Sequence, residues 1–242
     1  MQAEWRDGLE NLFADAEVGG SPTLSWSLSV ARGGTVAVHV LATGLTPGEP
    51  LSLSLTRAGR AMTRARWFRL VAVPVEENTG RVGFTCGRPS ITVVPYDKVT
   101  NVPNPFVVRQ APFHTYDAMM PITRRPLVAN AREAYRLQLP VPASSKLGAQ
   151  AYELTLKHGG NSHTLHLTVT THGALIPGVG KRSLPYTNWF SYDNIAKRHG
   201  TILWSPAFWR LLDRYARLMV HARQNAFWIP LSLIFKMADN GP

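Results

Sequence analysis

Residues 184–230 read LPYTNWFSYDNIAKRHGTILWSPAFWRLLDRYARLMVHARQNAFWIP. This stretch has the pattern of a strand end, an aromatic loop, a helix and a second strand, which is the opening of a β/α unit. Ser205 is placed to cap the helix, and Pro206 suits its first position. The apolar run from Asn225 to Phe235 is typical of a strand that is buried on both faces. A parallel β/α start needs more strands to cover it, so we expect the chain to be the front end of a larger (β/α)8-like architecture.

The helix is predicted from the spacing of its apolar residues. Those that recur at helical spacing are Phe208, Leu211, Leu212, Tyr215, Leu218, Met219 and Ala222. Asp213 and Arg217 are four residues apart on the polar side, where opposite charges pair on a helix. An unpaired β/α unit would expose Trp209, Phe227 and Trp228, so we expect self-association through this C-terminal unit.

The chain before this stretch has the pattern of short strands. In SWSLSV, for example, Trp26, Leu28 and Val30 alternate with serines. Strands are predicted for residues 25–30, 35–42, 51–56, 65–75, 81–87, 90–96, 135–143, 151–158 and 163–171. Gly, Pro and Asn separate them, and GGNS at 159–162 is a hairpin loop. This regular spacing is typical of an antiparallel β-sandwich.

We therefore predict a mainly β chain, with an N-terminal antiparallel β-sandwich followed by an incomplete β/α start like that of a TIM barrel. The predicted organisation is an N-terminal extension at 1–19, the sandwich at 20–172, a linker at 173–183 and the first β/α unit of a truncated (β/α)8 barrel at 184–242. The extension is expected to be a short amphipathic helix or a mobile end. Residues 97–126 are interrupted by prolines and are expected to be irregular.

The composition describes a basic protein with one thiol. The net charge is +11, and the acidic residues thin out after Glu153, with only three Asp and no Glu beyond it. The basic residues are dispersed rather than striped, so a solvated Arg-rich surface is favoured over binding of nucleic acid or an acidic polysaccharide. Cys86 lies in the apolar run VGFTCG, which indicates a buried inert thiol, and a lone cysteine excludes an intrachain disulfide.

The sequence shows no segment for export or membrane insertion. The N-terminal MQAEWRDGLENLFADAE carries five acids and no apolar core, so it is no signal peptide. The longest uncharged apolar run, residues 224–235, is too short to span a bilayer. We expect no membrane partner and, for the chain as written, a cytoplasmic location.

No cofactor or metal motif is present. His163 and His166 would lie on opposite faces of a strand, and His158 with His163 would give only two ligands, so we predict no metal site. GVGKRS lacks the first Gly of a phosphate loop, because Leu175 stands in its place, and Arg182 follows the lysine. We predict no cofactor.

The aromatic loop NWFSYDN carries the candidate site. Its candidate residues are Asn188, Trp189, Phe190, Tyr192 and Asp193. Aromatic faces stack on sugar rings, and Asn and Asp bond sugar hydroxyls. The alternative is that Trp189 and Phe190 pack the junction of strand and helix, and the sequence favours neither interpretation.

These residues also carry a family resemblance. TNWFSYDNIAKRHG and SPAFWRLLDRYARLMVHARQNAFWIP resemble the start of the catalytic barrel in glycoside hydrolase family 123 and in the related family known as domain of unknown function 4091. SLSVARGGTVAVHVL, RQAPFHTYDAMMP and EAYRLQLPVPASSKLGAQAYELTL are similar to earlier segments of that family, in the same order, so the resemblance covers about residues 20–235. Gly34 departs from the pattern, since the family usually has Glu there.

The resemblance implies a β-sandwich before a (β/α)8 barrel and a retaining β-N-acetylgalactosaminidase in which the substrate's acetamido group attacks, assisted by adjacent Asp and Glu residues. No adjacent Asp-Glu pair occurs in this chain, so no catalytic residue is assigned. We expect a truncated glycoside-hydrolase-like protein that binds carbohydrate in its complete form and is inactive alone. The alternatives are a non-catalytic carbohydrate-binding or interaction module, and an anion binder driven by the positive charge.

Overall fold

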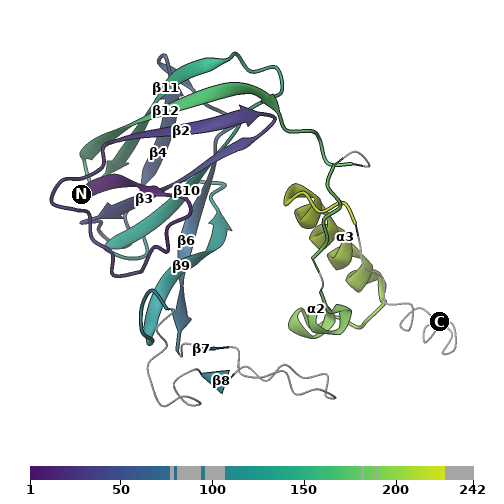
Figure 1. The fold of residues 1–242 in the computed structure, drawn as a ribbon. Coiled ribbons are helices and arrows are strands. Elements are labelled where there is room, and N and C mark those ends of the chain that lie inside the picture. Colours follow the sequence, from purple (N-terminus) through teal and green to yellow (C-terminus); the bar gives the residue numbers. More distant parts are fainter. Residues whose placement is uncertain (77–78, 81–93, 96–106, 181–182, 189, 227–242) are drawn as a thin grey trace, which may run out of the picture. The chain divides into compact units, whose positions relative to one another are not determined.

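The computed structural model describes residues 1–76, 79–80, 94–95, 107–180, 183–188 and 190–226. The chain forms two compact units, Met1–Leu175 and Ile176–Pro242, referred to below as unit 1 and unit 2 (Figure 1). Among the described residues the strands belong to unit 1 and the helices to unit 2. The protein is therefore mainly β, as predicted.

Unit 1 contains two five-stranded sheets and a short pair. Sheet A is antiparallel, and its strands in spatial order are β1 (Gln2–Asp7), β3 (Thr35–Thr43), β10 (Arg132–Pro140), β6 (Arg66–Val75) and β9 (Phe113–Pro121). Sheet B contains β2 (Ser25–Arg32), β12 (Asn161–Leu175), β11 (Gly148–His158), β4 (Ser52–Arg57) and β5 (Arg60–Ala61). β7 (Thr79–Gly80) pairs with β8 (Val94–Pro95).

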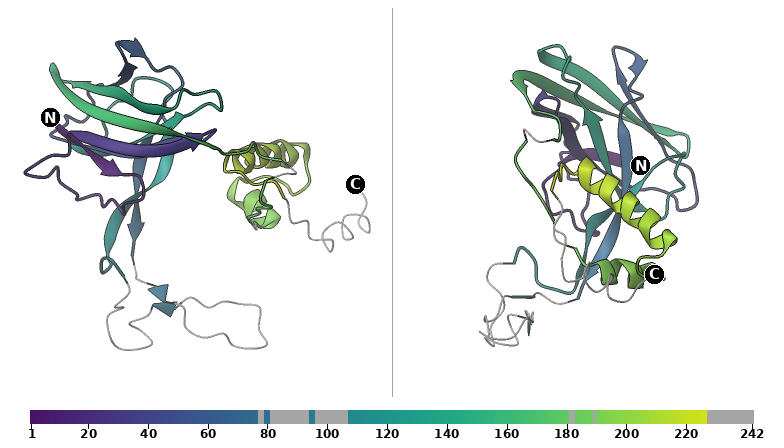
Figure 2. Two further views of the ribbon diagram at one scale, coloured as in Figure 1. Left: turned by 45° about the horizontal axis from the view of Figure 1, so that its top comes forward. Right: turned by 90° about the vertical axis from the view of Figure 1, so that its right-hand side faces the viewer.

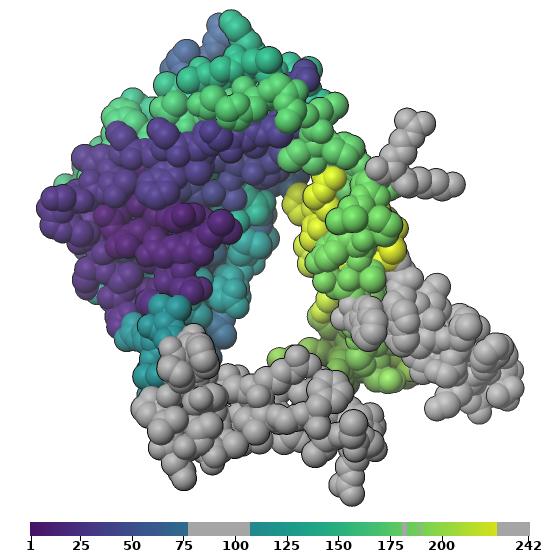
Figure 3. All heavy atoms as spheres, viewed as in Figure 1, coloured from purple at the N-terminus to yellow at the C-terminus, as the bar shows by residue number. Residues whose placement is uncertain are grey.

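One pairing corrects the prediction of a purely antiparallel arrangement. β2 and β12 are parallel, so sheet B is mixed. Parallel neighbours require a long connection, and more than a hundred residues separate these two strands in the chain. Figure 3 shows the purple N-terminal residues beside the green residues of β12 on one face of unit 1.

The two sheets share one hydrophobic core. Its fully buried side chains come from alternate positions of both sheets and include Val38, Val40, Leu137, Leu154, Leu156, Leu165 and Leu167. The predicted alternation of SWSLSV is confirmed, since Trp26, Leu28 and Val30 pack on this core and the serines are exposed. Trp5 is completely buried, and its Nε1 donates to the carbonyl of His166 at 2.8 Å, which links β1 to β12.

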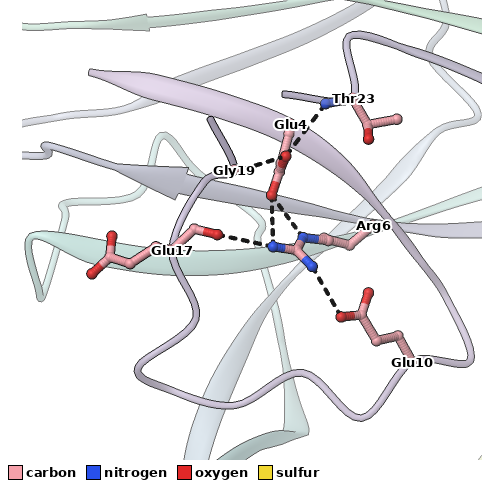
Figure 4. A network of polar contacts seen from close by, with 6 residues as sticks. All are labelled: Glu4, Arg6, Glu10, Glu17, Gly19 and Thr23. Atoms are coloured by element: carbon pink, nitrogen blue, oxygen red, sulfur yellow. Dashed lines mark hydrogen bonds and ion pairs between the residues drawn. The ribbon is translucent and has the colours of Figure 1, made fainter. Parts of the chain in front are cut away.

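The N-terminal residues are not a helix, and β1 corrects that expectation. In QAEWRD, Ala3 and Trp5 join the core, while Glu4 and Arg6 lie on the other face. Figure 4 shows the polar contacts of Arg6 with the loop that follows β1. Arg6 Nε donates to Glu4 Oε1 at 2.7 Å, and Arg6 Nη1 donates to Glu10 Oε1 at 3.1 Å. Arg6 also donates to the carbonyl of Glu17 at 2.9 Å, so polar contacts stabilise the outer face of β1.

Part of the segment predicted to be irregular is a strand. FHTYDAMMP forms β9, which pairs with β6 along its length, and the two strands extend together beyond the rest of sheet A (Figures 1 and 2). β9 is an edge strand with five exposed residues at its end, so it lacks the apolar alternation that identifies a half-buried strand. Residues 97–106 and Cys86 lie outside the described residues.

The hairpin loop between β11 and β12 is confirmed. Gly159 and Gly160 have φ of +53° and +78°, which suit a tight two-residue turn and which other residues rarely adopt. The turn sets the register that pairs Leu154 with Leu165 in the core.

Unit 2 contains α2 (Tyr192–Arg198) and α3 (Pro206–His221). The predicted start of α3 is confirmed, because Ser205 Oγ accepts from the amide of Phe208 at 3.2 Å and Pro206 is the first residue. The predicted strand end before the helix is not seen, since residues 183–188 form no strand. The second predicted strand, 225–235, lies outside the described residues except for its first two positions.

Candidate functional site

The structure places four of the five sequence-predicted site residues, two in a small core and two on the surface of unit 2. Tyr192 is buried in α2, with ring centroids 5.0 Å from Phe190 and 5.5 Å from Trp204. Both rings belong to the cluster around the fully buried Phe208. Their faces are therefore used in packing. Trp189 lies outside the described residues.

Asn188 and Asp193 are the exposed members of the predicted set. The Asn188 Oδ1 accepts from the Tyr186 hydroxyl at 2.9 Å, and its backbone amide donates to Gln224 Oε1 at 3.1 Å. Gln224 is fully buried and donates to the carbonyl of Ala226 at 3.0 Å, so it links residues 224–226 to the segment at Asn188. Asp193 is in the first turn of α2, where a negative charge is favoured by the helix dipole.

A cavity in unit 1 has a volume of about 760 Å³. It forms because β10 pairs with β6 only as far as Ala134 and Leu70, whereas β6 continues to Val75. The free side of β6 at Val71 and Ala72 lines the cavity. We refer to it as the Glu133 cavity. Its volume lies in the range of small-ligand sites.

Glu133 is a buried residue in the lining of this cavity, and both of its carboxylate oxygens have partners. Its Oε1 accepts from the amides of Ala129 at 2.5 Å and Asn130 at 3.3 Å. Its Oε2 accepts from the Tyr135 hydroxyl and lies 3.3 Å from Arg69 Nε. Burial, together with the negative charge of Glu133, raises the pKa of Tyr135, so this hydroxyl stays a donor. These contacts position the chain at 127–133 and leave the carboxylate no free oxygen for proton transfer.

Polar residues with exposed side chains are among those that line the Glu133 cavity. His114 and Asn130 are exposed, and the structure gives their side chains no hydrogen-bond partner. Arg132 forms an ion pair with Glu17 and donates to the carbonyl of Ala14 at 3.3 Å. The apolar residues that line the cavity include Leu70, Val71, Ala72 and Met120. Polar groups beside an apolar wall are the mixture that binds a sugar ring with its hydroxyls.

A second, smaller cavity lies against His39 on the outer face of sheet A. His39 is buried, and its Nε2 lies 2.7 Å from Arg136 Nη1, which also donates to the carbonyl of Gly8. Burial, reinforced by the positive charge of Arg136, lowers the pKa of His39 to about 4. Glu10 and Asp117 line the same cavity. The neutral imidazole therefore serves as an acceptor for Arg136.

The histidines of the β11–β12 hairpin do not converge on an ion. His158 is buried and bonds the backbone, with Nε2 2.8 Å from the amide of Thr46 and Nδ1 3.3 Å from the carbonyl of Pro50. His163 lies opposite Leu156 in the sheet. Within the described ranges, no three His, Cys, Asp or Glu side chains lie together as metal ligands would. Neither α2 nor α3 combines the length and apolar content that a bilayer crossing requires.

Sequence reasoning did not identify the Glu133 cavity. Its walls come from residues 14–17, 69–72, 114–120 and 129–133, which only the sheet pairing brings together. The signal in the sequence was a single acid at the start of an apolar strand, EAYRLQL, where burial of the carboxylate could have been noticed.

Comparisons with known proteins find distant structural similarity. No protein-family model matches the chain, and no curated protein matches it. A family 123 glycoside hydrolase from Clostridium perfringens, studied for glycolipid glycan hydrolysis, is 12% identical with a TM-score of 0.42 over 73% of this chain. The chain spans 28% of the length of that structure. The titin M3 domain is 9% identical with a TM-score of 0.26, over 61% of this chain and 88% of that domain. At these values neither similarity establishes a family or a function.

Proposed function

We propose that this chain is a carbohydrate-binding part of a protein related to glycoside hydrolase family 123, and that it binds sugar without hydrolysing it. In this proposal unit 1 is a β-sandwich, and unit 2 is the start of a β/α barrel. The family relation is supported by the ordered series of motifs in residues 20–235. The observation that carries sugar binding is the Glu133 cavity, whose lining combines the exposed polar residues Asn130 and His114 with apolar residues such as Leu70.

The absence of hydrolysis follows from the state of the carboxylates. Substrate-assisted hydrolysis needs acids that orient the acetamido group and move a proton. The chain has no adjacent Asp-Glu pair. In the Glu133 cavity, Glu133 is saturated by four partners and Glu17 is paired with Arg132. These groups bind and position, and neither is free to act as a general acid or base.

Binding of a β-linked N-acetylgalactosamine oligosaccharide, measured by titration calorimetry on the whole chain, tests the cavity. Asn130→Ala and His114→Ala should each weaken binding about fivefold or more, because each removes a direct hydrogen bond to a hydroxyl. Asn161→Ala is the matched control, since Asn161 is exposed on the β11–β12 hairpin outside this cavity. If all three variants bind with the affinity of the parent, the Glu133 cavity is not the sugar site.

Hydrolysis is tested separately with an aryl N-acetyl-β-galactosaminide. We expect no release of the aryl group above that of buffer. Turnover that disappears in a variant of this chain, such as Asp193→Asn, would contradict a purely binding role and would restore the aromatic segment of unit 2 as a catalytic site.

The sequence-predicted residues of unit 2 remain part of the proposal for the complete protein. Asn188 and Asp193 have exposed side chains and would be the sugar-contacting groups there, while Phe190 and Tyr192 form an edge-to-face ring pair. Self-association through unit 2 also remains a proposal, supported by the exposed Trp209, of which 48% is accessible. Trp209→Ser should lower the sedimentation coefficient at high concentration, and an unchanged coefficient would remove the idea.

A further inference from the structure

A third cavity, in unit 1, is lined by cations and no acids. It has a volume of about 370 Å³ and is defined here as the Arg57 pocket. Its charged side chains are Arg57 at the end of β4, Arg64 before β6 and Lys146 between β10 and β11. Three separate segments therefore bring positive charge to one place, and the lining contains neither Asp nor Glu.

Among the described residues, these cations have no carboxylate partners. No ion pair of the described residues involves Arg57, Arg64 or Lys146. In the β4–β5 hairpin, Arg57 lies directly opposite Arg60, an arrangement of like charges that is unfavourable in a bare sheet. The sequence contains no acid between Glu49 and Glu76 that could compensate locally. Within the part of the chain that the structure describes, no carboxylate therefore neutralises the charge of this pocket.

Neighbouring polar groups hold the pocket in a fixed geometry. The Gln150 Oε1 accepts from Arg57 Nη1 and from the Tyr152 hydroxyl, while its Nε2 donates to the carbonyl of Lys146 at 3.1 Å. Arg57 has further guanidinium N–H groups beyond the one that Gln150 takes. Gln150 therefore couples the loop that carries Lys146 to the strand that carries Arg57.

We infer that the Arg57 pocket binds one oxyanion, a sulfate or carboxylate group carried by an acidic glycan. Guanidinium groups match the planar or tetrahedral oxygens of such anions, and an anion would relieve the repulsion among the three cations. The lining includes a single aromatic residue, Tyr152, which is buried, so the pocket has no stacking surface for nucleobases. This inference deepens the proposed carbohydrate binding and rests on it for the identity of the carrier.

The test is titration of the whole chain with a heparin-derived sulfated tetrasaccharide and with its desulfated counterpart, at physiological ionic strength. We expect the sulfated sugar to bind more tightly, and inorganic sulfate to compete with it. The double variant Arg64→Glu with Lys146→Glu should lose about tenfold or more in affinity. Both side chains are exposed and unpaired, so these changes leave the core intact.

The control is Arg124→Glu with Arg125→Glu, which changes the net charge equally at the opposite end of β4. It should leave the affinity within about twofold. Equal losses in both double variants would overturn the pocket in favour of general electrostatic attraction. If oligo-dT binds more tightly than the sulfated sugar and the pocket variants lose that binding, the ligand is a nucleic acid and the assignment to a glycan is wrong. Competition by inorganic sulfate with no preference for the sulfated sugar would assign the pocket to a free anion.

The proposals for the Glu133 cavity and for the Arg57 pocket can each be contradicted without the other. If Asn130→Ala and His114→Ala do not affect the neutral oligosaccharide but the Arg57 pocket variants abolish binding of the sulfated one, the Glu133 cavity is wrong and the anion site stands. If the neutral sugar binds as proposed and the sulfated sugar gains nothing, the anion site is wrong alone.

Discussion

Unit 1 and unit 2 differ in how the sequence makes them stable. Unit 1 buries side chains from six strands, β1, β3, β4, β10, β11 and β12, in one core, and its contacts join distant residues, as in the bond from Trp5 to His166, 161 positions apart. The described part of unit 2 has a small hydrophobic core whose buried members are Tyr192, Ile195, Ala196 and Phe208. Its stability depends more on local interactions, such as the helix N-cap at Ser205. Long-range packing should therefore dominate the stability of unit 1, and helix-terminal contacts should matter in unit 2.

The largest effect is expected for Trp5→Ala. The change removes a fully buried indole and its bond to the carbonyl of His166, so we expect a loss of about 4 kcal/mol in the free energy of unfolding. Urea unfolding followed by tryptophan fluorescence measures it. Trp209→Ala is the control in unit 2, where the indole is half exposed. If both variants lose the same amount, the contrast between the units is wrong.

Glu133→Gln is expected to cost about 3 kcal/mol. The neutral amide leaves Arg69 without its buried carboxylate and keeps only some of the hydrogen bonds at the base of the cavity. Glu153→Gln, an exposed position on β11, should change the free energy of unfolding little. A stability like that of the parent would show that Glu133 does not hold this part of unit 1 together.

His39 should make unit 1 sensitive to acid. Its pKa is about 4 in the folded protein and 6.5 in an exposed histidine, so the unfolded chain binds the proton first as pH falls. The free energy of unfolding should therefore decline between about pH 6.5 and pH 4, by about 3 kcal/mol in total. His39→Gln should flatten the corresponding part of the pH profile. Parallel profiles of the parent and the variant would contradict a buried neutral imidazole.

The smallest effect is expected for Ser205→Ala in unit 2. The substitution removes the side-chain acceptor for the Phe208 amide, which should cost about 1 kcal/mol and reduce helical circular dichroism near the start of unfolding. Ser205→Asp supplies another good capping group and should preserve the signal. Because the described helices lie in unit 2, the signal at 222 nm reports mainly on that unit. An unchanged signal at 222 nm and an unchanged free energy of unfolding in Ser205→Ala would contradict a stabilising role of this cap.

The sequence predicted the features whose causes are local. Alternation identified strands such as β2, and the Ser205–Pro206 pair located the start of α3. β1 was missed because its outer residues, Glu4 and Arg6, find their partners in a loop that no periodicity reveals. α2 was read as part of an aromatic loop because seven residues are too short for a helical pattern.

The candidate sites were harder to predict because pairing between distant segments creates them. The Glu133 cavity depends on where β10 stops following β6, and the Arg57 pocket depends on a turn and a loop meeting at the end of β4. The basic residues are dispersed along the chain, so the sequence alone indicates a dispersed positive charge. The fold gathers three of them, and the charge pattern of the linear sequence does not show this.

The most direct measurement is a nuclear magnetic resonance titration of the labelled chain with a β-linked N-acetylgalactosamine oligosaccharide. The account predicts amide shifts at Asn130 and Ala131, on the rim of the Glu133 cavity, while the spectrum of the sugar stays that of the intact oligosaccharide. Absence of shifts on this rim at saturating sugar, or the appearance of free N-acetylgalactosamine, would contradict it.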